Sequence, residues 1–169
     1  MVDMQSKLLP AMRDGDRALD RCVRLVDAAR LLGIPAEATE QYPQGLGPTD
    51  EALSGRLPEG AAKRRFSAGG LLPWMSLPNE DGRHQVVVAG IEAHVCVLQT
   101  ALDLIAAGFD VHVPADAVAS RNEDDLRIAL ARLSAEGATV TGSESVLFEW
   151  CETSEAAEFK AISRMVTGR

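Results

Sequence analysis

Apolar residues recur at every third or fourth position between Asp16 and Leu32, which predicts an amphipathic helix, and Gly33 is a natural left-handed stop for it. The β-branched run at residues 85–89 predicts a strand that is covered on both faces. A second apolar stripe, over residues 94–107, predicts a helix directly after that strand. Strands and helices therefore alternate, which is typical of an α/β domain with a mainly parallel sheet.

The same pattern predicts the remaining elements. Strands are expected at residues 34–39, 62–66, 109–114 and 139–141, and helices at residues 123–136, 143–150 and 156–166. Residues 40–59 and 69–84 are rich in turn formers, and the second of these stretches carries an apolar flap. Only two residues precede Asp3, so a first strand that ends there is either unusually short or truncated at its start. With 169 residues, the chain is expected to form one domain over residues 1–169.

Charge and composition narrow the choice of partners. The formal net charge is −8, and the basic run Lys63-Arg64-Arg65 is too short for a nucleic-acid surface, so neither DNA nor RNA is expected as a partner. No run approaches the ~18 apolar residues of a membrane span, so no membrane is expected either. The three cysteines are far apart and form no zinc-binding pattern, which indicates reduced thiols and a cytoplasmic location.

Cys96 is the cysteine with a chemical signal. It stands in the first turn of the helix that follows the buried strand, where free N–H groups and the helix dipole stabilise an anion. Such a position is expected to lower the thiol pKa below its free value of ~8.5. The alternative is that Cys96 is a small buried apolar residue, which is the assignment we make for Cys22 and Cys151.

The segment GIEAHVCVLQTALDLIAAGFDVHVPADAVASR resembles, almost residue for residue, the corresponding block of isochorismatase-like hydrolases. The resemblance continues through VDMQSKLLPAM, LLGIPAEATEQYPQGLGPT, KRRFSA and GATVTGSESVLFEW, and so covers nearly the whole chain. It implies a three-layer, doubly wound α/β fold. The expected sheet is six-stranded and parallel, of order 3-2-1-4-5-6, with helices on both faces.

The resemblance also implies a catalytic triad of Asp3, Lys63 and Cys96. Asp3 would accept the thiol proton and later deliver it to the leaving group, and Lys63 would favour the thiolate. A cis peptide bond between Ile91 and Glu92 would turn the Glu92 N–H toward the site. There it would form an oxyanion hole with the Cys96 N–H.

Departures from the family pattern bear on the reaction. Nicotinamidases of this family carry an Asp-x-His metal motif where this chain has Glu40-Gln-Tyr42, so we expect no catalytic metal and no cofactor. True isochorismatases have a glycine at the position of Cys96, so the cysteine predicts attack on a C–N or acyl bond. The expected substrate is a small amide, carbamoyl compound or ester. Relatives form dimers or larger rings, so a homo-oligomer is expected as well.

Five residues at the expected mouth of the site are candidates for substrate contact, although they could equally cover the core: Gln41, Tyr42, Phe66, Trp74 and His94. The main alternative function is a non-catalytic binding module of the same fold. A third idea is redox sensing by Cys96, for which no resolving cysteine is near in sequence.

Overall fold

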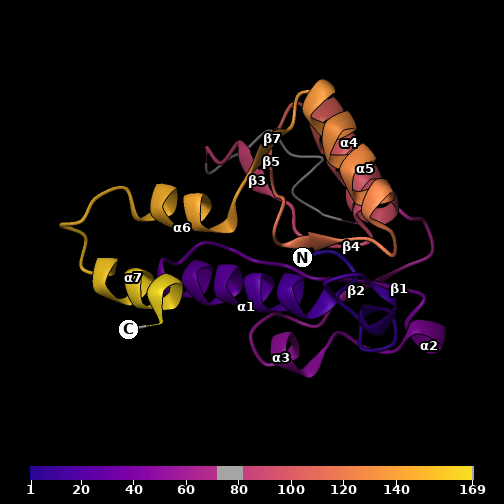
Figure 1. Ribbon diagram of the computed structural model, residues 1–169, viewed down its shortest axis with the longest axis horizontal. Helices are drawn as coiled ribbons and strands as arrows, with labels where there is room; N and C mark the ends of the chain where they lie inside the picture. The colour runs from indigo at the N-terminus through magenta and orange to yellow at the C-terminus, as the bar shows by residue number, and fades with distance from the viewer. Residues whose placement is uncertain (72–81, 169) are drawn as a thin grey trace.

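The computed structural model describes residues 1–71 and 82–168, and Figure 1 shows the arrangement of their helices and strands. The predicted flap at residues 69–84 lies mostly outside the described residues. The helices of more than one turn are α1 (Gly15–Leu31), α4 (Leu98–Ala106), α5 (Glu123–Ala135), α6 (Ser143–Cys151) and α7 (Phe159–Thr167). The short helical turns are η1 (Leu9–Ala11), α2 (Pro43–Leu46), α3 (Glu51–Ser54) and the π turn η3 (Ala93–Val97).

The strands are short and pair in parallel. They are β1 (Thr39–Gln41), β2 (Ala61–Lys63), β3 (Gln85–Val87), β4 (Gly90–Ile91), β5 (Asp110–Pro114), β6 (Val118–Ala119) and β7 (Thr139–Thr141). β1 pairs with β2, β4 with β6, and β5 lies between β3 and β7. Parallel strands joined by helices make this an α/β fold, as the sequence predicts. The pairs fall into three groups, so the continuous six-stranded sheet stays a prediction.

The first strand is reduced to one residue, Val2, which forms parallel bridges to Thr39 on one side and to Gly90 on the other. Val2 N donates to Ala89 O over 2.8 Å, and Ile91 N donates to Val2 O over 2.9 Å. Gly90 makes this close approach possible, because a Cβ at that position would overlap the Val2 carbonyl. Its φ of +126° is also one that favours glycine. The short strand thus delivers the next residue, Asp3, to the carboxyl edge of its neighbours.

Two buried apolar clusters pack around these strands. One contains Ala89, Ile91 and the buried face of α1, with Cys22, Leu25 and other α1 residues, and it extends to α6 and α7. The other contains Val88 and Val111 and the inner faces of η3, α4 and α5. In Figure 1 the helices accordingly gather in two sets, α1, α6 and α7 in one and α4 and α5 in the other. Val88 and Ala89 enter different clusters because neighbouring strand residues point to opposite faces.

Predicted and observed elements differ mainly at the second strand and at the helix that carries Cys96. The strand expected at residues 34–39 is found at Thr39–Gln41, where its residues pair with Ala61–Lys63 of β2. The helix expected from residue 94 begins with a π turn, in which Val97 N donates to Glu92 O five residues back. Among the described residues, no helix has both the length and the apolar character needed to cross a bilayer.

Candidate active site

Asp3 lies fully buried at the point where the first strand ends. Its backbone is left-handed, with φ of 51°, which turns the side chain toward β1 and β2. Oδ1 accepts a hydrogen bond from Thr39 Oγ1 over 2.8 Å, and Oδ2 accepts one from Lys63 Nζ over 2.6 Å. Each carboxylate oxygen can accept a second hydrogen bond, so Asp3 can still receive a proton from a third group.

Lys63 is the last residue of β2, and its side chain is 1% exposed. Besides Asp3, its ammonium donates to Gln41 Oε1 over 2.7 Å and to the Phe66 carbonyl over 2.8 Å. The Arg65 carbonyl is a fourth, longer acceptor at 3.4 Å, so the charge of Lys63 is paired and its donors are directed by fixed acceptors. A buried ion pair of this kind is tolerated only where such additional hydrogen bonds satisfy the charged groups.

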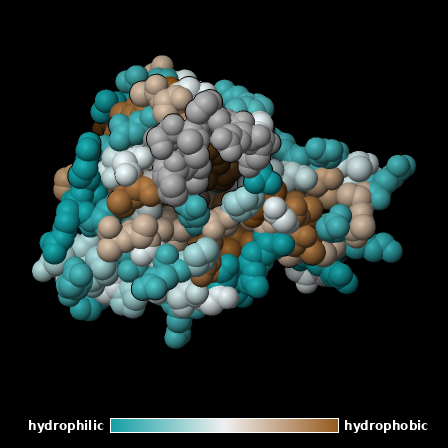
Figure 2. All heavy atoms as spheres, turned by 180° about the vertical axis from the view of Figure 1, so that it is seen from behind, coloured by the Kyte–Doolittle hydropathy of each residue, from teal (hydrophilic) through white to brown (hydrophobic). Residues whose placement is uncertain are grey.

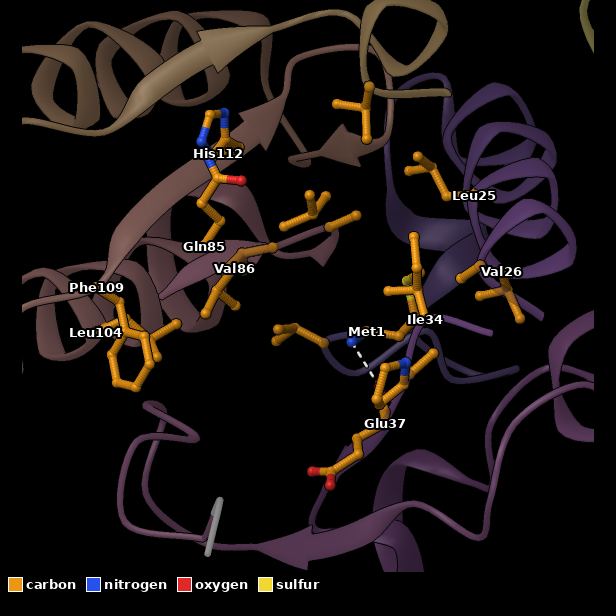
Figure 3. Close-up of a pocket in the computed structure, with 18 of the residues that line it drawn as sticks. Met1, Leu25, Val26, Ile34, Glu37, Gln85, Val86, Leu104, Phe109 and His112 are labelled. Carbon is orange, nitrogen blue, oxygen red and sulfur yellow. Dashed lines mark hydrogen bonds between the residues drawn. The ribbon is translucent and has the colours of Figure 1, made fainter. Parts of the chain in front are cut away.

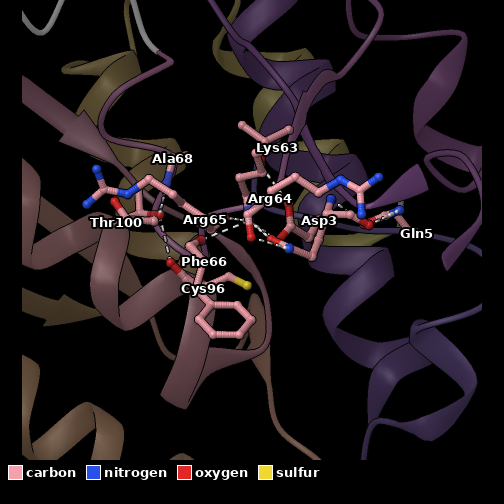
Figure 4. Close-up of polar contacts among 12 residues, drawn as sticks. Asp3, Gln5, Lys63, Arg64, Arg65, Phe66, Ala68, Cys96 and Thr100 are labelled. Carbon is pink, nitrogen blue, oxygen red and sulfur yellow. Dashed lines mark hydrogen bonds and ion pairs between the residues drawn. The ribbon is translucent and has the colours of Figure 1, made fainter. Parts of the chain in front are cut away.

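Cys96 lies in the π turn η3 and is 5% exposed. Figure 4 shows its sulfur on the side of the helix that faces Asp3 and Lys63. Burial, followed by the negative charge of Asp3 and its hydrogen bond, raises the pKa of the Cys96 thiol to about 12, and Lys63 opposes this effect only in part. The expected depression of the thiol pKa is therefore wrong for the resting site. Burial is the reason, and burial is not visible in the sequence.

The peptide bond between Ile91 and Glu92 is cis, at the position that the family resemblance implies. Glu92 then caps the π turn, since Val95 and Val97 both donate to its carbonyl. Cys96 lies in the first turn of this helix, between the two residues that donate to the Glu92 carbonyl. The Glu92 carboxylate points elsewhere and pairs with Arg121 Nε over 2.7 Å.

Two hydrogen-bonded contacts, which sequence reasoning missed, hold the loop that follows Lys63 against the helix of Cys96. Thr100 Oγ1 donates to the Cys96 carbonyl over 2.7 Å and accepts from Ala68 N over 2.9 Å. Ser67 Oγ donates to the Asp103 carboxylate one helical turn further on. The only sequence signal for this link is a hydroxyl residue four positions after the cysteine, a spacing at which threonine bonds back to the helix.

The predicted contact residues have different surroundings. Gln41 accepts a hydrogen bond from Lys63 through its oxygen and donates to Arg64 O over 2.9 Å, so it helps to fix the position of the Lys63 side chain. Tyr42 and Phe66 are 42% and 51% exposed. The Arg64 guanidinium lies 4.1 Å from the centroid of the Tyr42 ring, a cation–π contact.

His94 turns away from the triad, because its Nδ1 lies 3.0 Å from Ser120 Oγ and its Nε2 faces Asp125. Trp74 lies outside the described residues. A cavity of about 370 Å³ reaches Thr39, Ala68 and Thr100, but neither Asp3, Lys63 nor Cys96 lines it. No cluster of three or more potential metal ligands occurs within residues 1–71 and 82–168.

Comparisons with known proteins agree on the family. The model of the isochorismatase domain matches residues 1–145. Isochorismatase domain-containing protein 1 of Danio rerio is 40% identical over 97% of this chain. The chain spans 58% of the length of that relative.

Solved structures of similar fold carry more specific descriptions. A structure described as the MAR1 ribonuclease of Caenorhabditis elegans has a TM-score of 0.87 and 37% identity, and the match covers 98% of this chain and 86% of that one. The YcaC gene product of Escherichia coli, described as an octameric hydrolase of unknown specificity, has a TM-score of 0.87 and 26% identity over 99% of this chain and 86% of that one. YcaC of Pseudomonas aeruginosa, described with hexane-2,5-diol and covalent acrylamide, has a TM-score of 0.84 and 28% identity over 99% and 87%. The chain belongs to the isochorismatase family.

Proposed function

We propose that the chain is a cysteine hydrolase of small amides, carbamoyl compounds or esters, with Cys96 as nucleophile and Asp3 and Lys63 as its partners. One observation carries the proposal: a buried carboxylate and a buried ammonium, paired over 2.6 Å, both act on the pKa of one cysteine thiol. Such a constellation is a nucleophile with an adjacent base whose orientation is fixed by a third group.

The first half of the reaction forms an acyl-enzyme. With a pKa of about 12 the thiol is protonated at neutral pH, so Asp3 takes the proton from Cys96 as the sulfur attacks the carbonyl carbon. The carbonyl oxygen becomes an oxyanion, which the N–H groups of Glu92 and Cys96 stabilise. When the C–N or C–O bond breaks, the proton on Asp3 passes to the leaving group, and a thioester with Cys96 remains.

The second half releases the acid. Asp3, ionised again, removes a proton from a water molecule, whose oxygen attacks the thioester carbonyl. The thioester C–S bond breaks, and the same proton returns to the sulfur. Lys63 holds the Asp3 carboxylate in place throughout, and its positive charge compensates the negative charge that moves between Asp3 and the sulfur.

The proposed site requires strand ends that meet at one edge. We propose the sheet order 3-2-1-4-5-6 predicted from the sequence. In this order the strands are counted along the chain, so that the first is the short strand at Val2, the second is β1, the third is β2 and the fourth contains β3. The first and fourth strands are then neighbours. The bridges of Val2 to Thr39 and to Gly90 support this order, as do the pairs β1–β2, β3–β5 and β5–β7. In an open α/β sheet, ligands bind at such a switch point, beyond the carboxyl ends of the strands.

A trapped acyl-enzyme tests the proposal. The chain is treated briefly with p-nitrophenyl acetate, quenched in acid and digested, and acetyl groups are located by mass spectrometry. We expect a burst of p-nitrophenol and an acetyl group on the peptide that carries Cys96, and neither in Cys96→Ala. Equal acetylation of Cys151, or release of p-nitrophenol without a burst in both chains, would contradict the proposal. Covalent acrylamide in the P. aeruginosa YcaC structure supports the choice of an electrophilic probe.

RNA is the necessary control substrate, since a structure of similar fold is described as a ribonuclease. Our proposal predicts no cleavage of RNA by the chain. The net charge of −8 opposes binding of a polyanion, and Lys63, in the only basic run of the sequence, is turned inward to Asp3.

A further inference from the structure

Three neighbouring strands end near Asp3 and Lys63. Val2 bridges in parallel to Thr39 of β1, and β1 pairs in parallel with β2, so their carboxyl ends lie at one edge. In an open α/β sheet, ligands bind beyond this edge. The loops that follow the three strands carry exposed cationic and aromatic side chains that the proposed reaction does not use: Lys7, Tyr42, Arg64 and Arg65.

The Arg64 guanidinium lies against the Tyr42 ring, with 4.1 Å between its central carbon and the ring centroid. Hydrogen bonds fix both backbones next to the triad. Tyr42 N donates to Lys63 O over 2.9 Å. Arg64 O accepts from Gln41 Nε2 over 2.9 Å. The ring is fixed as well, because a Cβ at Gly45 would overlap it. Stacking covers one face of the guanidinium and leaves the N–H groups along its edge directed outward, where an acceptor can bind.

The cations of these loops have no acidic partner within residues 1–71 and 82–168. No carboxylate there forms an ion pair with Lys7, Arg64 or Arg65, and Lys7 donates instead to Gly45 O over 3.5 Å. By contrast, α1 and α5 each hold an arginine in an ion pair within the same helix. In a chain with a net charge of −8, cations without acidic partners beside a buried cysteine indicate a site for an anionic group.

Arg64 suits this role better than Arg65. Figure 4 shows the Arg64 side chain extended toward Asp3 and Gln5, whereas that of Arg65 extends toward Thr100. Among the described residues, the Arg65 guanidinium has no hydrogen bond, ion pair or ring contact that orders it, so binding through Arg65 would cost rotamer entropy. The stacked Arg64 has already lost this freedom. Two parallel N–H groups of its guanidinium match the two oxygens of a carboxylate.

The cavity of about 370 Å³ does not suit a charged group. Its walls are mainly apolar, with Leu25, Val86 and Leu104 among the side chains shown in Figure 3. Figure 2 likewise shows apolar residues in a hollow of the face that is seen from behind Figure 1. A carboxylate among such side chains would lose its hydration without a compensating partner. Since the triad also lies outside this cavity, a charged end of a substrate belongs at the strand ends.

We propose that Arg64, stacked on Tyr42, binds a carboxylate of the substrate. The substrate class is then a small amide, carbamoyl compound or ester that carries a carboxylate at the end opposite to the scissile bond. This inference rests on the proposed hydrolase and adds a specificity-determining residue to it.

The test compares substrates that differ only in this carboxylate. The mono-p-nitrophenyl esters of glutaric, adipic and pimelic acid are each paired with the corresponding neutral methyl ester. Three chain lengths are used, because the reach from Arg64 to Cys96 selects among them. Release of p-nitrophenol is measured as the excess over Cys96→Ala, which removes spontaneous hydrolysis. The ratio of kcat/KM for acid and methyl ester is taken within each variant, so that damage common to both reactions cancels.

We expect the unaltered chain to prefer the acid by about 10-fold or more for at least one chain length, as a hydrogen-bonded charge pair would give. In Arg64→Gln the ratio should fall to about 1. Arg65→Gln is the matched control and should keep the preference. A ratio near 1 in the unaltered chain at all three lengths would overturn the inference. A preference that survives Arg64→Gln would overturn it as well.

A binding measurement separates failure of this inference from failure of the proposed hydrolase. If no ester reacts faster than with Cys96→Ala, the hydrolase proposal fails, and the Arg64 site is tested by binding alone. Isothermal titration calorimetry then measures the affinity of monomethyl adipate for the chain and for Arg64→Gln. A Kd that is at least about 10-fold higher in Arg64→Gln supports the site. Equal Kd values, or no binding to either protein, exclude it.

Discussion

The Lys63 ammonium donates to the Asp3 carboxylate across 2.6 Å, although the two residues are 60 positions apart in the sequence. Neither side chain reaches solvent beyond 1% of its surface. Removing one member of a buried pair leaves the other charge uncompensated, which usually costs about 3–5 kcal/mol. The same ion pair therefore contributes to the stability of the fold and to the proposed reaction.

A double-mutant cycle measures this coupling. We expect Asp3→Asn and Lys63→Met each to lower the free energy of unfolding by about 3–5 kcal/mol. We expect the double variant to lose clearly less than the sum, because neither charge is then left alone. Urea unfolding of the four chains gives the coupling energy. Additive losses would mean that the pair contributes nothing as a pair.

Cys96→Ala separates the nucleophile from its packing. We expect the variant to lose activity by at least about 10³-fold, because no thioester can form. Cys151→Ala is the matched control, since Cys151 is also a buried cysteine with 5% exposure. Both variants should unfold at similar urea concentrations, but only Cys151→Ala should keep its turnover. An inactive Cys151→Ala, or an active Cys96→Ala, would exclude Cys96 as the nucleophile.

The raised pKa of the Cys96 thiol predicts the direction in which its rate of alkylation changes in two variants. With a pKa of about 12, Cys96 is protonated at pH 7.5 and should react with iodoacetamide more slowly than a free cysteine of pKa ~8.5. Asp3 raises this pKa and Lys63 lowers it. Asp3→Asn should therefore accelerate alkylation at the same pH while it abolishes turnover, and Lys63→Met should slow alkylation. Mass spectrometry of the Cys96 peptide gives the rates. Slower alkylation in Asp3→Asn would contradict the assignment.

Gly90 and Gly108 distinguish a close backbone contact from backbone strain. Both have positive φ, but an added Cβ meets the Val2 backbone only at Gly90 and has open space at Gly108. Gly108→Ala should cost only the strain of about 1–2 kcal/mol. Gly90→Ala should cost more and should abolish activity, because Val2 and with it Asp3 must move. Thermal unfolding and turnover are measured for both variants. Equal losses at the two positions would refute the close contact as the cause.

Self-association is a further prediction, which exposed apolar residues support. We expect a closed homo-oligomer, as in the E. coli YcaC gene product, which is described as octameric. Leu31 and Ile128 are exposed by 42% and 56% and are positions that an interface would cover. Sedimentation velocity at micromolar concentration measures the assembly. A single species of 18.1 kDa, the mass of one chain, would refute it.

Periodicity predicts most of the helices because each buries one regular stripe. The helix expected at Asp16–Leu32 is found at Gly15–Leu31, and the strand expected at residues 139–141 has those bounds. The second strand lies later than its sequence predicts, since its ladder depends on where another segment lies and not on its own residues. Asn122 precedes α5, and its side chain makes no capping bond to the helix backbone.

The sequence likewise predicts some properties of the candidate site and not others. Asp3, Lys63 and Cys96 can be identified from the sequence, because each stands in a motif and the motifs follow one another in the order that is typical of the family. The thiol pKa is predicted with the wrong sign because it depends on burial and on the nearness of Asp3, which are tertiary properties. Gln41 is a candidate for substrate contact from the sequence, and its hydrogen bond to the Lys63 ammonium over 2.7 Å is a tertiary contact that the sequence does not reveal.

Thr100 has one hydroxyl that serves two chain segments, as donor to Cys96 O and as acceptor from Ala68 N. Only a side chain that both donates and accepts at this length can take its place, so serine is the single conservative replacement and valine of equal shape is not one. A hydroxyl residue four positions after the cysteine is therefore a compact diagnostic. In a relative known only by its sequence, such a residue would indicate that the loop after the lysine contacts the helix of the cysteine, as the loop after Lys63 does here.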